Sequence, residues 1–309
     1  MPDLPRSLMD SLDEALGLLS DFASNQPIPE SEIRSPAKLL EQCEEICNNR
    51  LEPQPVRIVH HFACTGGTLI CKLLATMPNT LLLSEIDPLS QIMTRNRRSP
   101  AFAPTDLIYG MRVALRPADD AAVIEVFTAG LRALYTQVGS IGQRLVLRDH
   151  SHSHFCTDIA IDARPSLREI VQSVLPVLSI VTVRHPVDSF VSLDRNGWRH
   201  FAPFTIDEYA QRYLAFLERH KDIPMVRYED LLQEPIDILR RICTLLNLSF
   251  SDSAKSLLSV VAMSGDSGRS SNVIGHRPRG EFPGWIKKQA ASSAALGELC
   301  AHLGYEAAV

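Results

Sequence analysis

A turn of small residues follows the first strongly apolar run of the sequence and could bind an anion. The run Val56–Phe62 leads into Ala-Cys-Thr-Gly-Gly-Thr at positions 63–68, and the apolar segment 69–77 comes next. Glycines let backbone N–H groups converge, threonine hydroxyls add donors, and a helix N-terminus favours negative charge. Lys72 follows Cys71 rather than a glycine, so the turn lacks the Gly-Lys-Ser/Thr ending of nucleoside-triphosphatases. We therefore expect a phosphate-binding turn; the alternative is a turn whose small residues only permit close packing.

A second candidate anion site begins with an arginine after a later apolar run. Arg184 follows Leu178–Val183, and Ser192 lies eight residues further on. The carboxyl end of a parallel strand faces the crevice in which α/β sheets bind ligands, and a guanidinium group suits a phosphate. The alternative is an arginine that fixes a loop through a salt bridge, for example with Asp188.

Alternate histidines at positions 150, 152 and 154 follow the apolar run 144–147. In an extended chain their side chains would point to one face. We favour His150 as a general base, because an imidazole that titrates near neutrality can remove a proton from an acceptor group. Two alternatives stay open. The histidines could bind zinc or iron together with Asp149 or Asp158, or they could cap a helix and hydrogen-bond a loop.

A second candidate base follows another apolar run. Glu85 and Asp87 come just after Thr80–Leu83, at the carboxyl end of a predicted strand. Glu85 is therefore the alternative catalytic residue. Asp87 precedes Pro88, a pair that is also typical of a helix start.

Short β-branched runs that alternate with helical patterns predict the elements that position these residues. This alternation is typical of an α/β protein with a mostly parallel central sheet between layers of helices. Strands are expected at Val56–Phe62, Thr80–Leu83, Arg144–Leu147, Leu178–Val183 and Pro224–Arg227. Helices are expected near Gly67–Thr76, Ala118–Gln137, Ser166–Val174, Val187–Asn196, Ile206–His220 and Pro235–Leu246.

Two domains are expected: an N-terminal helical extension over residues 1–52 and an α/β domain over 53–309. The first expectation rests on apolar residues at helical spacing in 8–22 and on a Ser35-Pro36 pair that starts a second helix. We expect these helices to pack on the main domain; a homodimer formed through them is the alternative.

The composition excludes several classes of protein. The 309 residues include 31 Lys and Arg against 36 Asp and Glu, a net charge of −5, which excludes a polybasic nucleic-acid binder or an electrostatic membrane binder. No run approaches the roughly 18 apolar residues of a membrane helix, so no membrane anchor is expected. Seven cysteines without a Cys-x-x-Cys pair favour reduced thiols and a cytoplasmic location.

Four segments, in this order, resemble the sulfotransferases that use 3′-phosphoadenosine 5′-phosphosulfate (PAPS). Residues 64–68 are similar to the family's 5′-phosphosulfate loop, the Arg184–Ser192 pair to its 3′-phosphate site, and Tyr228–Leu231 to a block near the adenine. The basic stretches 265–269 and 277–280 resemble the loop that closes over the nucleotide. The resemblance covers about residues 56–285. It implies a P-loop-like fold, PAPS as donor, 3′-phosphoadenosine 5′-phosphate (PAP) as product, and no metal requirement.

The resemblance assigns the nucleotide to a set of residues spread over these segments. They are Cys64, Thr65, Gly66, Gly67, Thr68, Arg184, Ser192, Tyr228, Arg269, Arg277, Arg279 and Gly280.

One position departs from the family pattern. A Lys or Arg usually opens the phosphosulfate loop, where this chain has Cys64. A thiol cannot supply that positive charge. Another cation could replace it (His60, His61, Arg148 or Arg269), backbone N–H donors could provide more of the stabilisation of the phosphosulfate charge, or activity could be lost.

The resemblance implies transfer of a sulfuryl group from PAPS to a hydroxyl or amine acceptor, with His150 or Glu85 as base. The acceptor, a sugar, lipid, peptide or small metabolite, leaves no signature in the sequence. Two alternatives come from other classes: a nucleotide-binding protein without transferase activity, and a metal hydrolase built on the histidines.

Overall fold

The computed structural model describes residues 53–92, 99–252, 254–258, 261, 263, 274, 275 and 281–306. The chain divides into two units, residues 1–53 and 54–309, and every described residue except Pro53 belongs to the second. The predicted N-terminal helices and their dimerisation lie outside the described residues, as do Arg269, Arg277, Arg279 and Gly280, and these expectations stay predictions.

Parallel strands form the five-stranded sheet that carries the site. They are β1 (Val56–His61), β2 (Thr80–Ile86), β3 (Arg144–Asp149), β4 (Val177–Val183) and β5 (Met225–Arg227), in the spatial order β2-β3-β1-β4-β5. β1 is buried along its whole length, as expected for a strand covered on both faces. The predicted strands are confirmed, and β2 and β3 run a few residues further than expected.

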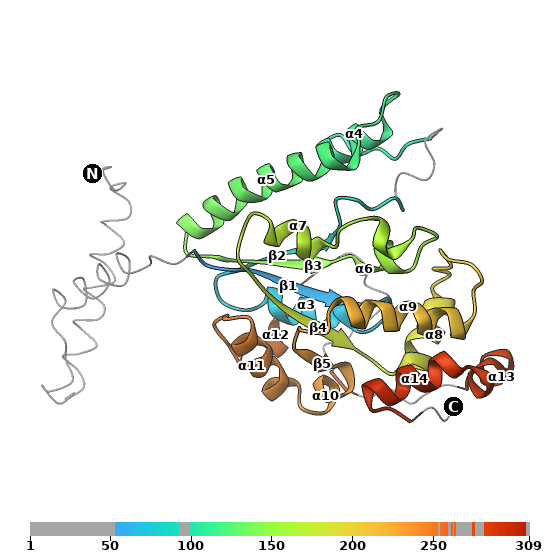
Figure 1. Ribbon diagram of the computed structural model, residues 1–309. Helices are drawn as coiled ribbons and strands as arrows, with labels where there is room; N and C mark the ends of the chain where they lie inside the picture. The colour runs from blue at the N-terminus through green and yellow to red at the C-terminus, as the bar shows by residue number, and fades with distance from the viewer. Residues whose placement is uncertain are drawn as a thin grey trace, which may run out of the picture. The chain divides into compact units, whose positions relative to one another are not determined.

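Helices cover both faces of this sheet, which confirms the three-layer α/β/α architecture (Figure 1). Side chains alternate along β1, so Val59 packs with α3 on one face while Val56 and Ile58 pack with α5 and α7 on the other. The helices are α3 (Gly67–Ala75), α4 (Leu107–Val113), α5 (Asp120–Ser140), α6 (Ser151–Phe155), α7 (Leu167–Gln172), α8 (Pro186–Arg195), α9 (Ile206–Arg219), α10 (Tyr228–Gln233), α11 (Pro235–Leu245), α12 (Ala254–Leu257), α13 (Gly284–Ser292) and α14 (Ala294–Leu303).

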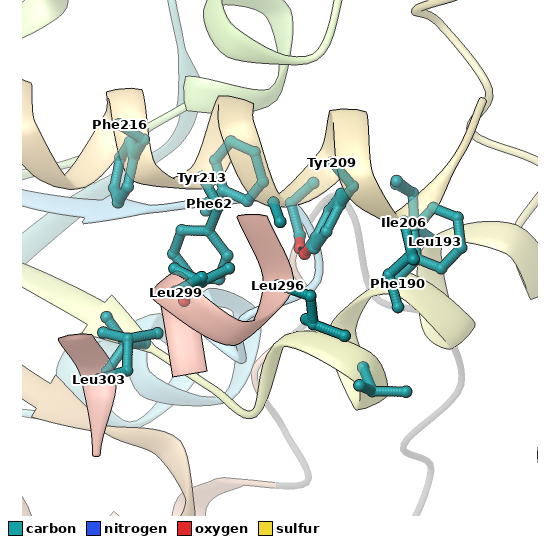
Figure 2. Close-up of a cluster of buried hydrophobic side chains, with 14 of the residues drawn as sticks. Phe62, Phe190, Leu193, Ile206, Tyr209, Tyr213, Phe216, Leu296, Leu299 and Leu303 are labelled. Carbon is teal, nitrogen blue, oxygen red and sulfur yellow. Dashed lines mark hydrogen bonds between the residues drawn. The ribbon is translucent and has the colours of Figure 1, made fainter. Parts of the chain in front are cut away.

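An aromatic cluster fixes α9 against the carboxyl end of β1. The ring of Phe62 stacks on that of Tyr213, with centroids 4.5 Å apart, and the centroid of the Phe216 ring lies 5.5 Å from that of Phe62. Figure 2 shows that leucines of α14 complete this cluster from below α9. The loop that begins at Phe62 is therefore anchored by buried aromatic area, which gives large apolar stabilisation.

Local signals explain where the helices begin. α7 opens with a capping box in which Ser166 and Glu169 bond each other's backbone N–H groups, and α8 has Pro186 at its first position. The six predicted helices are confirmed. Sequence patterns did not predict α4, α6, α10, α12, α13 or α14.

The extended conformation considered for residues 150–154 is not adopted, because Ser151–Phe155 forms the short helix α6. The side chains of His150, His152 and His154 therefore do not share one face as they would in a strand. His152 Nε2 lies 3.0 Å from His200 Nδ1, and His154 Nε2 donates to the carbonyl of Ile161 at 2.8 Å. A metal site made of these three histidines is not formed.

None of the helices in the described ranges has the length and apolar character needed to cross a bilayer. The cysteines in the same part of the chain are free thiols: Cys64, Cys71, Cys156, Cys243 and Cys300.

Candidate active site

The candidate site lies where the chain leaves adjacent strands in opposite directions. After β1 the chain enters α3 on one face of the sheet, and after β4 it enters α8 and α9 on the other. Such a switch point is where open α/β sheets bind ligands. The two segments touch there, because Arg184 Nη1 donates to the carbonyl of Cys64 at 3.2 Å. The loop and the arginine predicted from separate patterns are thus brought together.

The loop 63–68 is shaped by close packing around its glycines. Gly66 has φ +91°, and a Cβ there would lie 2.1 Å from Cδ2 of Tyr228. A Cβ on Gly67 would lie 2.4 Å from Cγ of His61. Both positions therefore require glycine. Because α3 begins at Gly67, the N–H groups of Gly67 and Thr68 have no carbonyl partner within the helix and can donate to an anion.

The two threonines of the loop differ in role. Thr65 is fully buried, and its hydroxyl donates to the carbonyl of Phe62 at 2.8 Å, which closes the turn. Thr68 stands on the first turn of α3, and its hydroxyl accepts a hydrogen bond from Arg148 at 2.8 Å. Of the two hydroxyls, that of Thr68 is therefore the one placed beside a cation.

Arg148 brings a buried positive charge to the loop from the end of β3. Its side chain is only 5% exposed, and Nη2 also lies 3.3 Å from His61 Nε2. Burial and the charge of Arg148 hold the pKa of His61 well below its usual value, so this imidazole is neutral. A neutral His61 accepts from Arg148 and supplies no charge, which leaves Arg148, among the candidates that the structure describes, as the cation on this side of the loop. Sequence patterns named it only as one of four candidates.

The two candidate bases touch each other. Glu85 Oε2 lies 3.2 Å from His150 Nε2, and Glu85 Oε1 lies 2.7 Å from Nη1 of Arg148. Glu85 has φ +60°, a left-handed conformation that is uncommon outside glycine, and the β2–β3 register shifts between Leu83 and Ile86. Strain of this kind is often found at functional sites. Here the irregular backbone places one carboxylate between an arginine and a histidine.

The thiol of Cys64 faces the predicted 3′-phosphate pair. Burial raises the pKa of this thiol, against smaller opposing effects of Ser192, Arg184 and Asn196 around it. Asn196 Nδ2 lies 3.9 Å from the sulfur. The thiol is therefore neutral, so Cys64 provides neither the missing cation nor a thiolate. Ser192 and Arg184, predicted as a pair, meet at this residue.

Tyr228 and Glu229 tie the site to the C-terminal helices. The guanidinium carbon of Arg184 lies 5.1 Å from the centre of the Tyr228 ring, close enough for a cation–π contact. Glu229 accepts from the backbone N–H of His185 at 3.0 Å and from the hydroxyl of Tyr305 at 2.6 Å. The position of Arg184 thus depends on contacts with the Tyr228–Leu231 block, which the sequence had placed only near the adenine.

Two other candidates have structural partners. Asp87 receives a two-pronged hydrogen bond from Arg164, at 2.7 and 2.8 Å, so it fixes a loop rather than acting as a base. His60, considered above as a cation for the loop, points to the other face of the sheet, where its Nδ1 lies 2.7 Å from Asp149.

Comparison with known proteins gives a family and a set of similar structures. Residues 62–252 match the model of the sulfotransferase family. No curated protein matches the chain. Similar solved structures include the sulfotransferase domain of the Synechococcus PCC 7002 olefin synthase (19% identity, TM-score 0.45, covering 84% of this chain and 97% of that one).

Two further structures are similar at comparable distance. The sulfotransferase domain of the curacin biosynthetic pathway has 17% identity and a TM-score of 0.46, and the match covers 82% of this chain and 99% of that domain. Mouse sulfotransferase SULT7A1 complexed with PAP has 14% identity and a TM-score of 0.37, with 80% and 88% covered.

Proposed function

Because the chain belongs to the sulfotransferase family, we propose that it transfers a sulfuryl group from PAPS to a hydroxyl or amine of an acceptor molecule. The single observation that carries the proposal is the convergence of two arginines on one loop. Arg184 contacts the carbonyl of Cys64, and Arg148 contacts the hydroxyl of Thr68. A donor that carries a phosphosulfate and a separate 3′-phosphate needs two such centres of positive charge.

The nucleotide would bind across the switch point. The first-turn N–H groups of α3 and the Thr68 hydroxyl would hold the 5′-phosphosulfate, with the positive end of the helix dipole behind them. Arg184 and Ser192 would hold the 3′-phosphate. Tyr228, whose ring already packs on Gly66 and under Arg184, would line the nucleoside side of the site.

Arg148 would replace the lysine or arginine that the loop lacks at Cys64. Negative charge grows on the oxygen between sulfur and phosphorus as that bond breaks, and a fixed cation stabilises it most strongly in a site that excludes water. Arg148 is buried and already oriented by Glu85, Thr68 and His61. Little reorganisation is therefore needed during the reaction.

His150 would act as the base and Glu85 would orient it. A carboxylate only accepts hydrogen bonds, so the contact at 3.2 Å places a proton on His150 Nε2 and leaves Nδ1 free to take one. The proton of the acceptor hydroxyl would move to Nδ1 while the acceptor oxygen bonds to sulfur. The sulfur–oxygen bond to the 5′-phosphate breaks, and PAP leaves with that electron pair.

Calorimetry with PAP and a turnover assay with PAPS test the proposal. We expect PAP to bind the wild-type chain and Arg184→Ala to weaken binding, while Arg168→Ala, on an exposed pair with Asp222, leaves it unchanged. A wild-type dissociation constant weaker than about 1 mM, roughly −4 kcal/mol, would contradict the assignment. Release of PAP from PAPS with a panel of hydroxyl and amine acceptors then tests transfer itself.

One observation supports a second candidate function, that of a nucleotide-binding protein without transferase activity. The residue at the start of the loop is a neutral thiol. Tight binding of PAP together with no sulfate transfer to any acceptor, in the wild type and in Cys64→Lys, would favour this function.

A further inference from the structure

A buried group of two histidines and an aspartate lies behind the sheet, away from the candidate active site. Because side chains alternate along a strand, His60 and Asp149 point to the face opposite His61 and Arg148. His60, Asp149 and His220 are 0%, 5% and 3% exposed. One potential ligand atom from each lies within 4.8 Å of those of the other two, a grouping that no other His, Cys, Asp or Glu residues make in the described part of the chain.

His220 presents an unused lone pair inside this group. Its Nδ1 lies 2.8 Å from the carbonyl oxygen of Phe216, which can only accept, so Nδ1 carries the proton. Nε2 is therefore unprotonated, and it is buried without a hydrogen-bond partner. A buried polar atom without a partner is costly and calls for an explanation.

The other two side chains are already oriented by outer hydrogen bonds. His60 Nε2 lies 3.3 Å from the hydroxyl of Ser179, and Ser151 donates to Asp149 Oδ2 at 2.7 Å. Together with the carbonyl of Phe216 behind His220, each of the three side chains has an outer partner. Metal-binding histidines and carboxylates nearly always have such partners, which fix the ring orientation and the tautomer.

We propose that His60 Nδ1, Asp149 and His220 Nε2 bind one divalent transition-metal ion, with zinc as the ion that two imidazoles and a carboxylate favour. On binding, the proton of the neutral His60 ring moves from Nδ1 to Nε2, where it can be donated to the Ser179 hydroxyl, and Nδ1 is left to bind the ion. The metal satisfies the lone pair of His220. Burial of the site makes its role structural: it joins the ends of β1 and β3 to the C-terminal end of α9. The proposal does not depend on sulfuryl transfer.

The test measures zinc in the full-length chain. The protein is purified without metal-affinity steps, treated with chelator, and titrated with zinc chloride against a chromophoric competitor. We expect about one equivalent of tightly bound zinc and a higher melting temperature on binding. X-ray absorption of the zinc-loaded protein is expected to show two imidazole ligands. A wild-type chain that binds well below one equivalent, or zinc without imidazole ligands, would overturn the proposal whatever the variants do.

Substitutions test whether these three residues bind the zinc. His220→Phe keeps a ring beside Phe155 and Phe216, and Asp149→Asn keeps a hydrogen-bond acceptor for Ser151. Each is expected to weaken zinc binding at least about tenfold. His302→Gln, on the exposed side of α14, is the control for adventitious histidine binding and should bind like the wild type. Folded His220→Phe protein with unchanged zinc affinity would contradict the site.

Discussion

Arg148 Nη2 donates a hydrogen bond to Thr68 Oγ1 at 2.8 Å, between residues 80 positions apart in the sequence. This bond links the end of β3 to the first turn of α3. It places a buried guanidinium beside the loop 63–68, in which Cys64 stands at the position of the family's cation and is uncharged at neutral pH. The consequences of that arrangement can be measured.

Replacing Arg148 should remove most of the activity while leaving the second anion site intact. We expect Arg148→Met to lower kcat by about 10²–10³-fold, the range seen when one stabilising donor is lost from an active site. Arg148→Lys should recover part of the loss, because it restores the charge but not the fork that reaches both Thr68 and Glu85. Steady-state kinetics at saturating PAPS measure both variants. Equal activity of Arg148→Met and wild type would contradict the role.

Adding a lysine at Cys64 tests whether the loop still lacks a cation. If Arg148 supplies the charge, Cys64→Lys in the wild-type background should not raise kcat. The new ammonium also lies near Arg184, whose charge already acts on the Cys64 side chain, so PAP-free protein should lose stability. Turnover and thermal melting with and without PAP measure the two effects. A large gain in turnover would show instead that the family cation is missing and that Arg148 does not replace it.

Gly66→Ala should disrupt the loop. A methyl group there would meet the Tyr228 ring at 2.1 Å, in a backbone conformation with φ +91° that L-residues rarely adopt. We expect a loss of about 1–3 kcal/mol in the free energy of unfolding, together with weaker PAP binding. Gly110→Ala is the matched control, because nothing lies within 4 Å of its Cβ in the helix α4. That change should stabilise the chain by up to about 1 kcal/mol. Urea unfolding compares them.

Glu169 should stabilise the fold at neutral pH, and this contribution should be lost in acid. Burial raises its pKa, but hydrogen bonds from Arg219 and from Ser166 outweigh this and lower the pKa of the carboxyl overall. A depressed pKa means a contribution that is fully present above the unfolded value, about 4.3, and is lost as the pH falls through the folded value. The stability difference between wild type and Glu169→Gln should therefore be larger at neutral pH than near pH 3.

Urea unfolding at both pH values measures this difference, with Glu298→Gln on the exposed face of α14 as the control. A difference that stays constant between the two pH values would show that Glu169 acts through packing and not through its charge.

The sequence predicted the sheet because buried parallel strands are rich in apolar, β-branched residues: β4 is a nearly continuous run of them, and β1 has Val56, Ile58 and Val59. The resemblance to sulfotransferases implied that the Cys64 loop and Arg184 bind one nucleotide, and the two segments do touch. The sequence could not rank Arg148 among four cations, because that choice depends on the strand pairing that places Arg148 beside Val59, two residues from His61 and on the same face of the sheet.

The helical turn that follows β3, where an extended chain was considered, has a physical cause. Polar and histidine residues in alternation match a strand pattern, but the chain turns into α6 directly after β3, where Ser153 bonds the carbonyl of His150 at 2.8 Å. Serine bonds to nearby backbone groups of this kind favour turns and helix starts over strands. Tyr228 to Gln233 was likewise read for its motif alone and missed as a helix.

The strand order also has a consequence for how the protein is made. The candidate site requires the contact of Arg184 with Cys64, which are 120 residues apart in sequence, and β1 pairs with β4 over its whole length. Contacts between distant segments form slowly, since a long loop must close first. A growing chain on the ribosome therefore has no assembled anion site until β4 has emerged, and β1 remains unpaired on that edge until then. During synthesis, one edge of β1 with its apolar side chains therefore stays exposed until β4 emerges. Exposed strand edges of this kind are sites that chaperones bind.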